Sequence, residues 1–341
     1  MNSNSKSYYK KKGGSSSTSS KYKKKKSIKT SKSKTTKTTK TSKSTRAKSR
    51  PKTKTGGSSS SSLTTKSIIK KEIPMNSGNR LIPKIYKYST TGRKSSNEDT
   101  MDIVLSRQGI FYGVYDGHGG KCVSKFLKNN LSKFFTSSRK NYPLNKSDIE
   151  SKFHKTHKLM EEKLKDKIHE VGSTCLCVLQ NPKTKSIQVI NAGDCRAVLC
   201  RNNLGVPLSR DHKPHWFDER KRIEKIDEKS DKKFKIIKEH RDVPRVNGLA
   251  VSRGFGDTAD MPKGNYLPDV FNYKYNSNDS FLVIASDGLI DVMENQDIVN
   301  YILECKRKYK GKSVNYAQKL AKHAITLGSG DNITVIISFL V

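Results

Sequence analysis

Residues 110–120 read Ile-Phe-Tyr-Gly-Val-Tyr-Asp-Gly-His-Gly-Gly. The aromatic and β-branched run Ile110–Tyr115 predicts a buried strand that ends at Asp116. Because Gly117 follows, the backbone can turn closely there and expose a carbonyl oxygen. A carboxylate beside a free carbonyl is the oxygen ligand set that Mg²⁺ or Mn²⁺ prefers. This stretch therefore predicts a β core with a candidate metal site at its end.

Two other aspartates occupy similar places along the chain. Asp287 follows the apolar run 281–285 and precedes a glycine, and Asp331 comes just before the apolar run 333–341. Any one Asp-Gly pair is more typical of a turn. Carboxylates at three strand ends can converge on one point, and such a cluster is costly without a cation to neutralise it. Their joint occurrence favours a metal site.

The remaining periodicity predicts mixed α and β structure. Helices are expected at 121–135, 147–168, 295–309 and 313–327, with Ser147 and Glu150 as a capping box for the second. The elements do not follow the regular alternation of a parallel sheet. The charged segment 220–241 receives no assignment. Further strands are expected at 173–179, 186–192, 197–200, 281–285 and 333–341.

Charge is distributed unevenly over the 341 residues, whose formal net charge is +38. Residues 1–71 hold 23 of the 69 lysines and arginines, and the first acidic residue is Glu72. This segment is also poor in large apolar residues, so it cannot bury enough surface to offset the entropy of ordering. We expect a disordered basic tail over 1–84 and one folded domain over 85–341.

The tail has several possible roles. A solvated tail is the favoured interpretation, and the alternatives are a nuclear import signal at 21–26, a nucleic-acid contact or attraction to an acidic membrane. No run approaches the ~18 apolar residues of a membrane span, and the N-terminus lacks the apolar core of a signal peptide. An intracellular protein, in cytoplasm or nucleus, is expected. Six cysteines fit that compartment as free thiols and do not show zinc spacing.

Eight short motifs follow one another along the chain, at 92–99, 111–120, 172–174, 191–196, 211–214, 245–257, 285–292 and 328–335. In this order they are similar to the motifs of the metal-dependent protein serine/threonine phosphatases of type 2C. They cover about residues 85–341, and their order is far more specific than any one of them. The resemblance implies two antiparallel sheets packed as a sandwich and flanked by helix pairs, an α+β fold in four layers (αββα).

The resemblance also implies a pair of Mg²⁺ or Mn²⁺ ions. Asp116 would bridge them, and the carbonyl of Gly117 would bind one. Asp287 and Asp331 would hold the other. The ion pair would lower the pKa of a water, which attacks the phosphorus of phosphoserine or phosphothreonine in a protein without a phosphoenzyme.

Other positions carry supporting roles in the resemblance. Glu98 would act mainly through metal-bound water, with Asp99 supporting it. Asp194 and Asp291 match positions linked to a weaker third ion. His118 matches the proposed general acid, and an imidazole titrating near pH ~6.5 suits that role. Lying between two glycines, His118 is expected to be exposed and free to reach the substrate.

The chain departs from the family pattern in three places. Lys94 stands where the phosphate-binding Arg is usual, with Arg93 before it, and either could serve. The run 245–253 is one residue shorter than usual, and the lysine-rich segment 220–241 replaces a Gly-Gly, so the substrate-selecting flap would differ. No metal ligand is lost. An active, monomeric phosphatase with phosphoprotein substrates is therefore favoured over a catalytically weak or inactive scaffold tethered by its tail.

Overall fold

The computed structural model describes residues 82–340, except 138–139, 228–235 and 239–243. The tail expected over 1–84 lies outside the described residues apart from its last three positions, so its disorder and its partners stay predictions. The first described strand, β1, begins at Ile85.

One five-stranded sheet has β14 (Asp279–Ala285) at its centre. β15 (Ile333–Phe339) and β8 (Arg196–Arg201) pair with it on either side. β1 (Ile85–Thr90) and β9 (Leu204–Pro207) form the two edges. Every pairing in this sheet is antiparallel.

The second five-stranded sheet has β6 (Cys175–Asn181) at its centre. β7 (Ser186–Ala192) and β3 (Ile110–Tyr115) flank it. β13 (Asp269–Lys274) and β2 (Thr100–Leu105) are the edges, again with antiparallel pairing throughout.

Alternation along the central strands explains the packing of these sheets. In β3, Tyr112 and Val114 are buried in the core between the two sheets. Phe111 and Tyr115 point the other way and are buried against helices. Because successive side chains of a strand face opposite sides, a strand that is apolar at every position must be covered on both faces.

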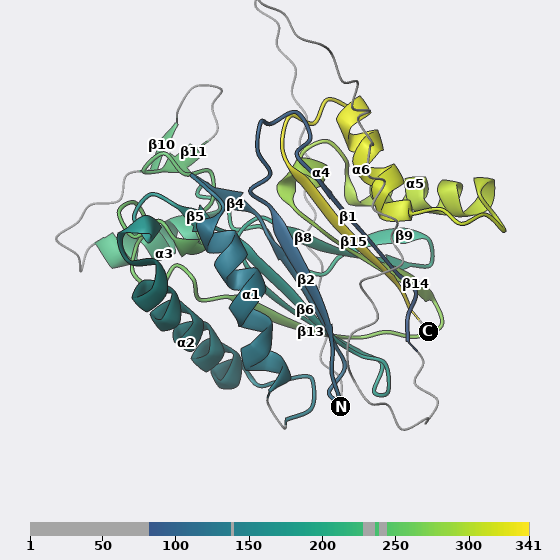
Figure 1. The fold of residues 1–341 in the computed structure, drawn as a ribbon, viewed down its shortest axis with the longest axis horizontal. Helices are drawn as coiled ribbons and strands as arrows, with labels where there is room; N and C mark the ends of the chain where they lie inside the picture. The colour runs from purple at the N-terminus through teal and green to yellow at the C-terminus, as the bar shows by residue number, and fades with distance from the viewer. Residues whose placement is uncertain (1–81, 138–139, 228–235, 239–243, 341) are drawn as a thin grey trace, which may run out of the picture. The chain divides into compact units, whose positions relative to one another are not determined.

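Helix pairs provide that cover on the outer faces. α1 (Cys122–Thr136) and α2 (Lys146–Leu164) pack on the β3 sheet, and α5 (Asn295–Lys308) and α6 (Tyr316–Thr326) pack on the β14 sheet. Figure 1 shows the two pairs on opposite sides of the sheets. The predicted α+β sandwich in four layers is confirmed. None of the helices in the described part of the chain has the length and apolarity needed to cross a bilayer.

Short elements gather near one end of the sandwich. β4 (Gly117–His118), β5 (Gly172–Ser173) and β12 (Phe255–Gly256) form a three-stranded ladder in which β5 is central. α4 (Asp287–Ile290) follows β14 directly. These elements hold the residues that the sequence singled out as a site.

The bounds and the N-cap expected for the second helix are corrected. The helix expected at 147–168 begins at Lys146 and gives way to the 3₁₀ helix η1 (Lys165–Ile168), and its cap is Asn145, whose side chain accepts from the N–H of Asp148 at 2.8 Å. The predicted Ser147 cap was therefore wrong.

The charged segment left unassigned at 220–241 contains part of α3 (Phe217–Asp227) and the strand β10 (Ile236–Lys238). β10 pairs with β11 (Pro244–Val246). Few apolar positions mark this segment, which is why its periodicity was hidden.

Candidate metal centre

Two of the predicted carboxylates, Asp116 and Asp287, interact with each other, and both act together with Asp331 on the ammonium group of Lys94. Asp116 follows β3, Asp287 begins α4, and Asp331 stands two residues before β15. Burial, followed by the negative charges of Asp287 and Asp99, raises the pKa of Asp116 well above its ordinary value. Burial, with the charges of Asp194 and Asp291, raises the pKa of Asp287 to about 8. Without a cation, these two carboxyl groups therefore favour the protonated form, because their surroundings stabilise a negative charge poorly.

The backbone on either side of Asp116 is fixed by the neighbouring strands. Its N–H donates to the hydroxyl of Thr174 at 3.1 Å, and its carbonyl accepts from the N–H of Thr174 at 2.9 Å. A Cβ at Gly117 would lie 2.6 Å from the carbonyl oxygen of Glu98, so only glycine fits there. The motif 172–174 thus positions the aspartate.

Asp99 gives a further test of whether the site fits a cation. Its side chain is buried, Oδ2 accepts from the hydroxyl of Ser286 at 2.8 Å, and Oδ1 is buried without a hydrogen-bond partner. Burial is the main cause that raises the pKa of Asp99 to about 6. An unsatisfied buried oxygen beside other carboxylates is the donor chemistry that hard divalent cations take. Glu98 next to it is half-buried, with its N–H donating to Asn332 Oδ1 at 2.8 Å.

Lysines neutralise two of the predicted ligands. Lys94 Nζ lies 3.2 Å from Asp331 Oδ2, and both side chains are about half exposed. Lys213 Nζ lies 2.5 Å from Asp194 Oδ2, which is buried. Over the described ranges, no three His, Cys, Asp or Glu side chains are already arranged as a metal-binding group. The ligand roles of these residues, and of the exposed Asp291, stay predictions.

Lys94 and Arg93 point to different places. The charges of Asp331, Asp287 and Asp116 all act on Lys94, and its hydrogen bond to Asp331 is the largest cause that raises its pKa. Arg93 instead donates from Nη2 to the carbonyl oxygen of Ile325 at 3.3 Å, at the end of α6. Of these two side chains, Lys94 is therefore the one that faces the carboxylate cluster.

His118 is held by a partner that the sequence did not reveal. Its Nε2 lies 2.8 Å from Asp257 Oδ2, with the His118 side chain 29% exposed and that of Asp257 2% exposed. Burial lowers the pKa of His118, but the hydrogen bond and charge of Asp257 outweigh it and the net shift is upward. The expectation of a free, exposed histidine was wrong.

Gly172 makes that pairing possible. A Cβ at this position would lie 2.0 Å from Asp257 Oδ2 and 2.5 Å from His118 Nε2. Asp257 follows β12 and is distant in sequence from His118, so only the β4–β5–β12 ladder brings them together. The sequence signal was present in the motif 245–257, but nothing in it assigned a role to Asp257.

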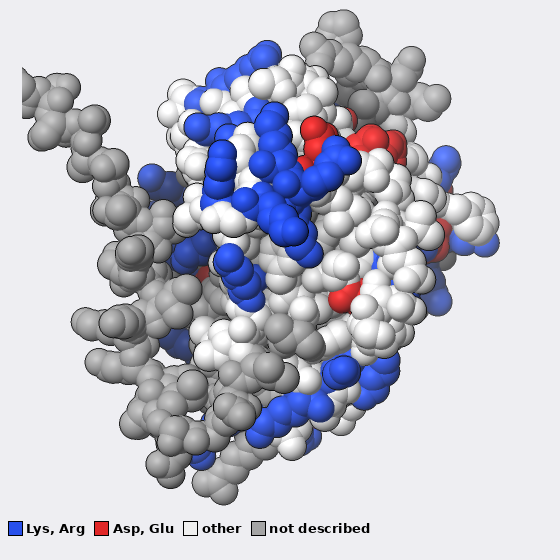
Figure 2. Space-filling view, turned by 90° about the vertical axis from the view of Figure 1, so that its right-hand side faces the viewer, with Lys and Arg blue, Asp and Glu red and all other residues white. Residues whose placement is uncertain are grey.

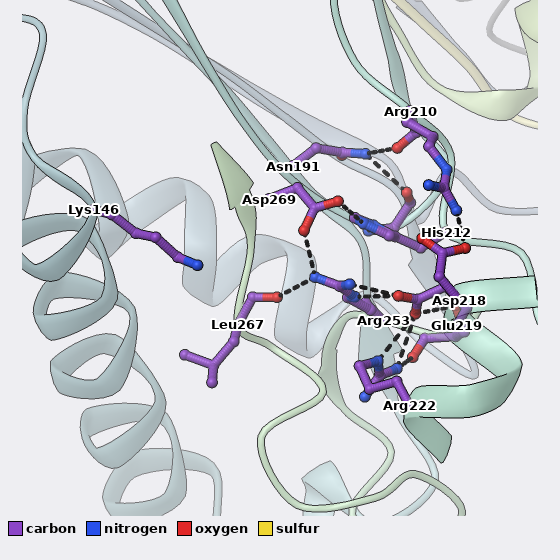
Figure 3. A network of polar contacts seen from close by, with 12 residues as sticks. Lys146, Asn191, Arg210, His212, Asp218, Glu219, Arg222, Arg253, Leu267 and Asp269 are labelled. Atoms are coloured by element: carbon purple, nitrogen blue, oxygen red, sulfur yellow. Dashed lines mark hydrogen bonds and ion pairs between the residues drawn. The ribbon is translucent and has the colours of Figure 1, made fainter. Parts of the chain in front are cut away.

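A second polar network lies beside the site, and Figure 3 shows it from close by. Glu219 of α3 is buried and accepts from Arg253 Nε and Arg222 Nη2, each at 2.9 Å. Arg253 also donates to Asp269 at 2.9 Å, and His212 Nε2 lies 3.1 Å from the other oxygen of Asp269. Burial alone would raise the pKa of Glu219, but the arginines outweigh it and lower that pKa to about 2. The network ties α3 to the β3 sheet, so Arg253 has a structural role in it.

Comparison with known proteins identifies the family. The protein phosphatase 2C family model matches residues 90–333. The PP2C-like domain-containing protein R307 of Acanthamoeba polyphaga mimivirus is 42% identical over 47% of this chain and 98% of its own length. Probable protein phosphatase 2C 11 of Arabidopsis thaliana is 36% identical over 76% of this chain and 67% of its own. The chain therefore belongs to the protein phosphatase 2C family, which confirms the predicted class, a protein serine/threonine phosphatase.

Solved structures agree at the level of the fold. The serine-threonine phosphatase 2C from Toxoplasma gondii superposes with a TM-score of 0.64 at 21% identity, covering 79% of this chain and 98% of that one. Lengths differ among the curated relatives, since the chain spans 56% and 53% of two plant phosphatases from Oryza sativa and Arabidopsis thaliana.

Proposed function

We propose that this chain hydrolyses phosphoserine and phosphothreonine in proteins, using two Mg²⁺ or Mn²⁺ ions and a weaker third. The observation that carries the proposal is the burial of two neighbouring carboxyl groups, Asp116 and Asp287, each with a raised pKa, at the end of the sandwich. A protein that keeps such a cluster buried incurs a cost that divalent cations would remove.

The chain's own residues supply the framework for that chemistry. Asp116, the carbonyl of Gly117, Asp287 and Asp331 would hold the two ions, and Glu98 and Asp99 would orient water around them. Divalent ions bound there supply a water of lowered pKa as the nucleophile and neutralise phosphoryl charge. The Thr174 bonds keep Asp116 from moving when the substrate binds.

His118 would deliver the proton to the departing serine or threonine oxygen. With Nε2 donating to the Asp257 carboxylate, Nδ1 is the nitrogen left to face the substrate. Asp257 acts as a positioning residue, because it fixes the ring and favours the cationic form that can donate. The raised pKa of His118 agrees with this role.

Lys94 would meet the phosphoryl oxygens at the rim of the cluster. It would have to leave Asp331 when an ion binds there, since both cations compete for the same carboxylate. Lys keeps the charge of Arg but lacks the two-pronged fork, so phosphate affinity should be lower than with Arg. Arg93 lies away from the cluster and does not compete for this role.

A third ion would bind more weakly for a related reason. Asp194 already has Lys213 as its counter-charge at 2.5 Å, and a cation at Asp194 and Asp291 would compete with that ammonium group. We also propose that the substrates are phosphoproteins, that the chain is a monomer and that the basic tail binds an anionic partner.

The test is phosphate release from a phosphothreonine peptide by the full chain with Mn²⁺, with Mg²⁺ and with EDTA, beside Asp287→Asn. The proposal expects activity that requires metal and is lost in the variant. No release by a folded, metal-bound chain would instead favour the scaffold alternative.

A further inference from the structure

A strongly basic surface covers the outer helices of the β14 sheet. Residues 305–330 contain seven lysines and arginines and no aspartate or glutamate. Six of the seven are exposed and Lys319 is partly so. Figure 2, which looks onto this side of the molecule, shows lysine and arginine side chains gathered there. We call it the α5–α6 basic surface, formed by Lys306, Arg307, Lys308, Lys310, Lys312, Lys319 and Lys322.

Three cations of this surface lie over aromatic rings. Lys308 and Lys319 lie over the ring of Tyr309 at 5.8 and 4.9 Å, and Lys306 lies over Phe339 at 5.4 Å. Within the described part of the chain, none of the seven is ion-paired with an acidic side chain. Ring contacts order the side chains while leaving the charge available to an outside anion.

The surface is continuous with the candidate metal centre. Lys319 and Lys322 lie three residues apart and so share a face of α6, with Lys322 directly before the last turn of the helix. At that turn Arg93 donates to the carbonyl of Ile325, and Lys94, the next residue, reaches Asp331. Basic side chains therefore run from the helix pair to the edge of the carboxylate cluster.

We propose that the α5–α6 basic surface docks an acidic or multiply phosphorylated segment of the protein substrate, beside the residue being hydrolysed. This inference rests on the proposed function. The carboxylates of the site repel an anionic substrate, and cations placed outside it offset that repulsion and steer the substrate inward. An extended peptide advances about 3.3 Å per residue, so a run of acidic side chains beginning a few positions from the phosphothreonine would extend toward Lys322 and Lys319.

Continuity with the site favours a segment of the substrate over other anions. A nucleic acid or an acidic membrane would be attracted by charge alone, and its binding would not require basic side chains that lead to Lys94. The basic tail of the chain carries the same sign of charge and is not a suitable occupant.

The test compares two double variants of the full chain, each of which removes two positive charges from one helix. Lys319→Gln/Lys322→Gln removes two charges from α6. Lys155→Gln/Lys158→Gln removes the same number at the same spacing from the exposed face of α2. Substrates are phosphothreonine peptides carrying a run of glutamates, or the matching run of glutamines, on either side from about the third position outward. Both kcat/KM with Mn²⁺ and binding of the labelled peptides in EDTA are measured.

The α6 pair should lose about threefold to tenfold in kcat/KM and in affinity for the glutamate peptide, with little change for the glutamine peptide. The loss should shrink as salt rises. The α2 pair should change neither.

Equal losses for both peptides, or equal losses in both variants, would overturn the proposal. So would a loss confined to a single-stranded oligonucleotide or to equimolar phosphatidylserine–phosphatidylcholine vesicles. If wild type hydrolyses neither peptide, the proposed function fails, and binding in EDTA still decides whether the docking surface exists.

Discussion

Replacing Asp287 by Asn should stabilise the metal-free protein while removing its response to metal. The pKa of Asp287 is raised from 3.8 to about 8 by burial and by neighbouring carboxylates. A carboxyl whose folded pKa is raised favours folding below pH 3.8, and that contribution is lost as the pH rises toward about 8. Asn does not titrate, so at pH 7 it avoids the free-energy cost of keeping the buried carboxyl protonated far above its unfolded pKa.

The size of the effect follows from the shift. At pH 7 the group lies about three pH units above its unfolded pKa, which corresponds to about 4 kcal/mol as an upper bound. Because Asn also alters the hydrogen bond to Asp116, we expect a gain of about 1–3 kcal/mol in the free energy of unfolding. Wild type should in turn gain about 3 kcal/mol from Mn²⁺ at a hundred times its dissociation constant, and the variant much less.

Urea unfolding followed by circular dichroism at pH 7 measures both the stability of the metal-free protein and the stabilisation by Mn²⁺. The variant should be the more stable protein in EDTA and the less responsive one in Mn²⁺. Glu304→Gln, which removes an exposed carboxylate from α5, should leave wild-type stability and metal response unchanged. An Asp287→Asn variant that is destabilised in EDTA, or that responds to Mn²⁺ like wild type, would refute the reasoning.

Three further substitutions test other parts of the site. Asp257→Asn should lower kcat for a phosphothreonine peptide by about tenfold to a hundredfold, and p-nitrophenyl phosphate turnover much less, because its better leaving group needs less help from His118. Lys94→Arg should lower KM for phosphopeptides by about threefold to tenfold at similar kcat. Glu219→Gln should cost about 3 kcal/mol of stability at pH 7 in urea unfolding, since it removes the buried carboxylate that pairs with both Arg222 and Arg253.

The Asp257 test has a control variant, and the Asp257 and Lys94 tests each have an outcome that would contradict them. Asp166→Asn removes the partner of the exposed His169 and should leave both substrates unaffected. Equal losses on both substrates in Asp257→Asn would argue against an acid role, and an unchanged KM in Lys94→Arg would argue against phosphate binding at Lys94.

The Glu219 prediction also has a pH signature. Its folded pKa of about 2 lies below the ordinary 4.5, so its contribution is present above pH 4.5 and is lost as pH falls toward 2. Wild type should lose that stability over this window and Glu219→Gln should not. A variant with the same acid profile as wild type would contradict the proposed network.

The sequence predicted the interior of both sheets and missed their edges. The strands β3, β6, β7, β8, β14 and β15 were all expected, because burial on both faces leaves long apolar runs. The missed edges β1, β2, β9 and β13 are only partly buried, so polar residues interrupt their pattern. An edge strand forms because it pairs with a neighbouring strand, and the sequence of the edge segment alone does not reveal that pairing.

The site divides in a similar way. Aspartates at strand ends could be recognised locally, and the structure does bring Asp116 and Asp287 together. The partners that hold the site, Asp257 on His118 and Lys213 on Asp194, depend on contacts between distant segments. Their residue types carry no local mark of these roles, so only the assembled fold could reveal them.

The most direct test of the central claim is a Mn²⁺ titration in which bound ion and phosphate release from a phosphothreonine peptide are measured in the same samples. The account predicts that the rate rises with occupancy and saturates as two ions bind per chain, with both signals lost in Asp116→Asn. Full phosphate release in EDTA, or binding and release unchanged in Asp116→Asn, would contradict it.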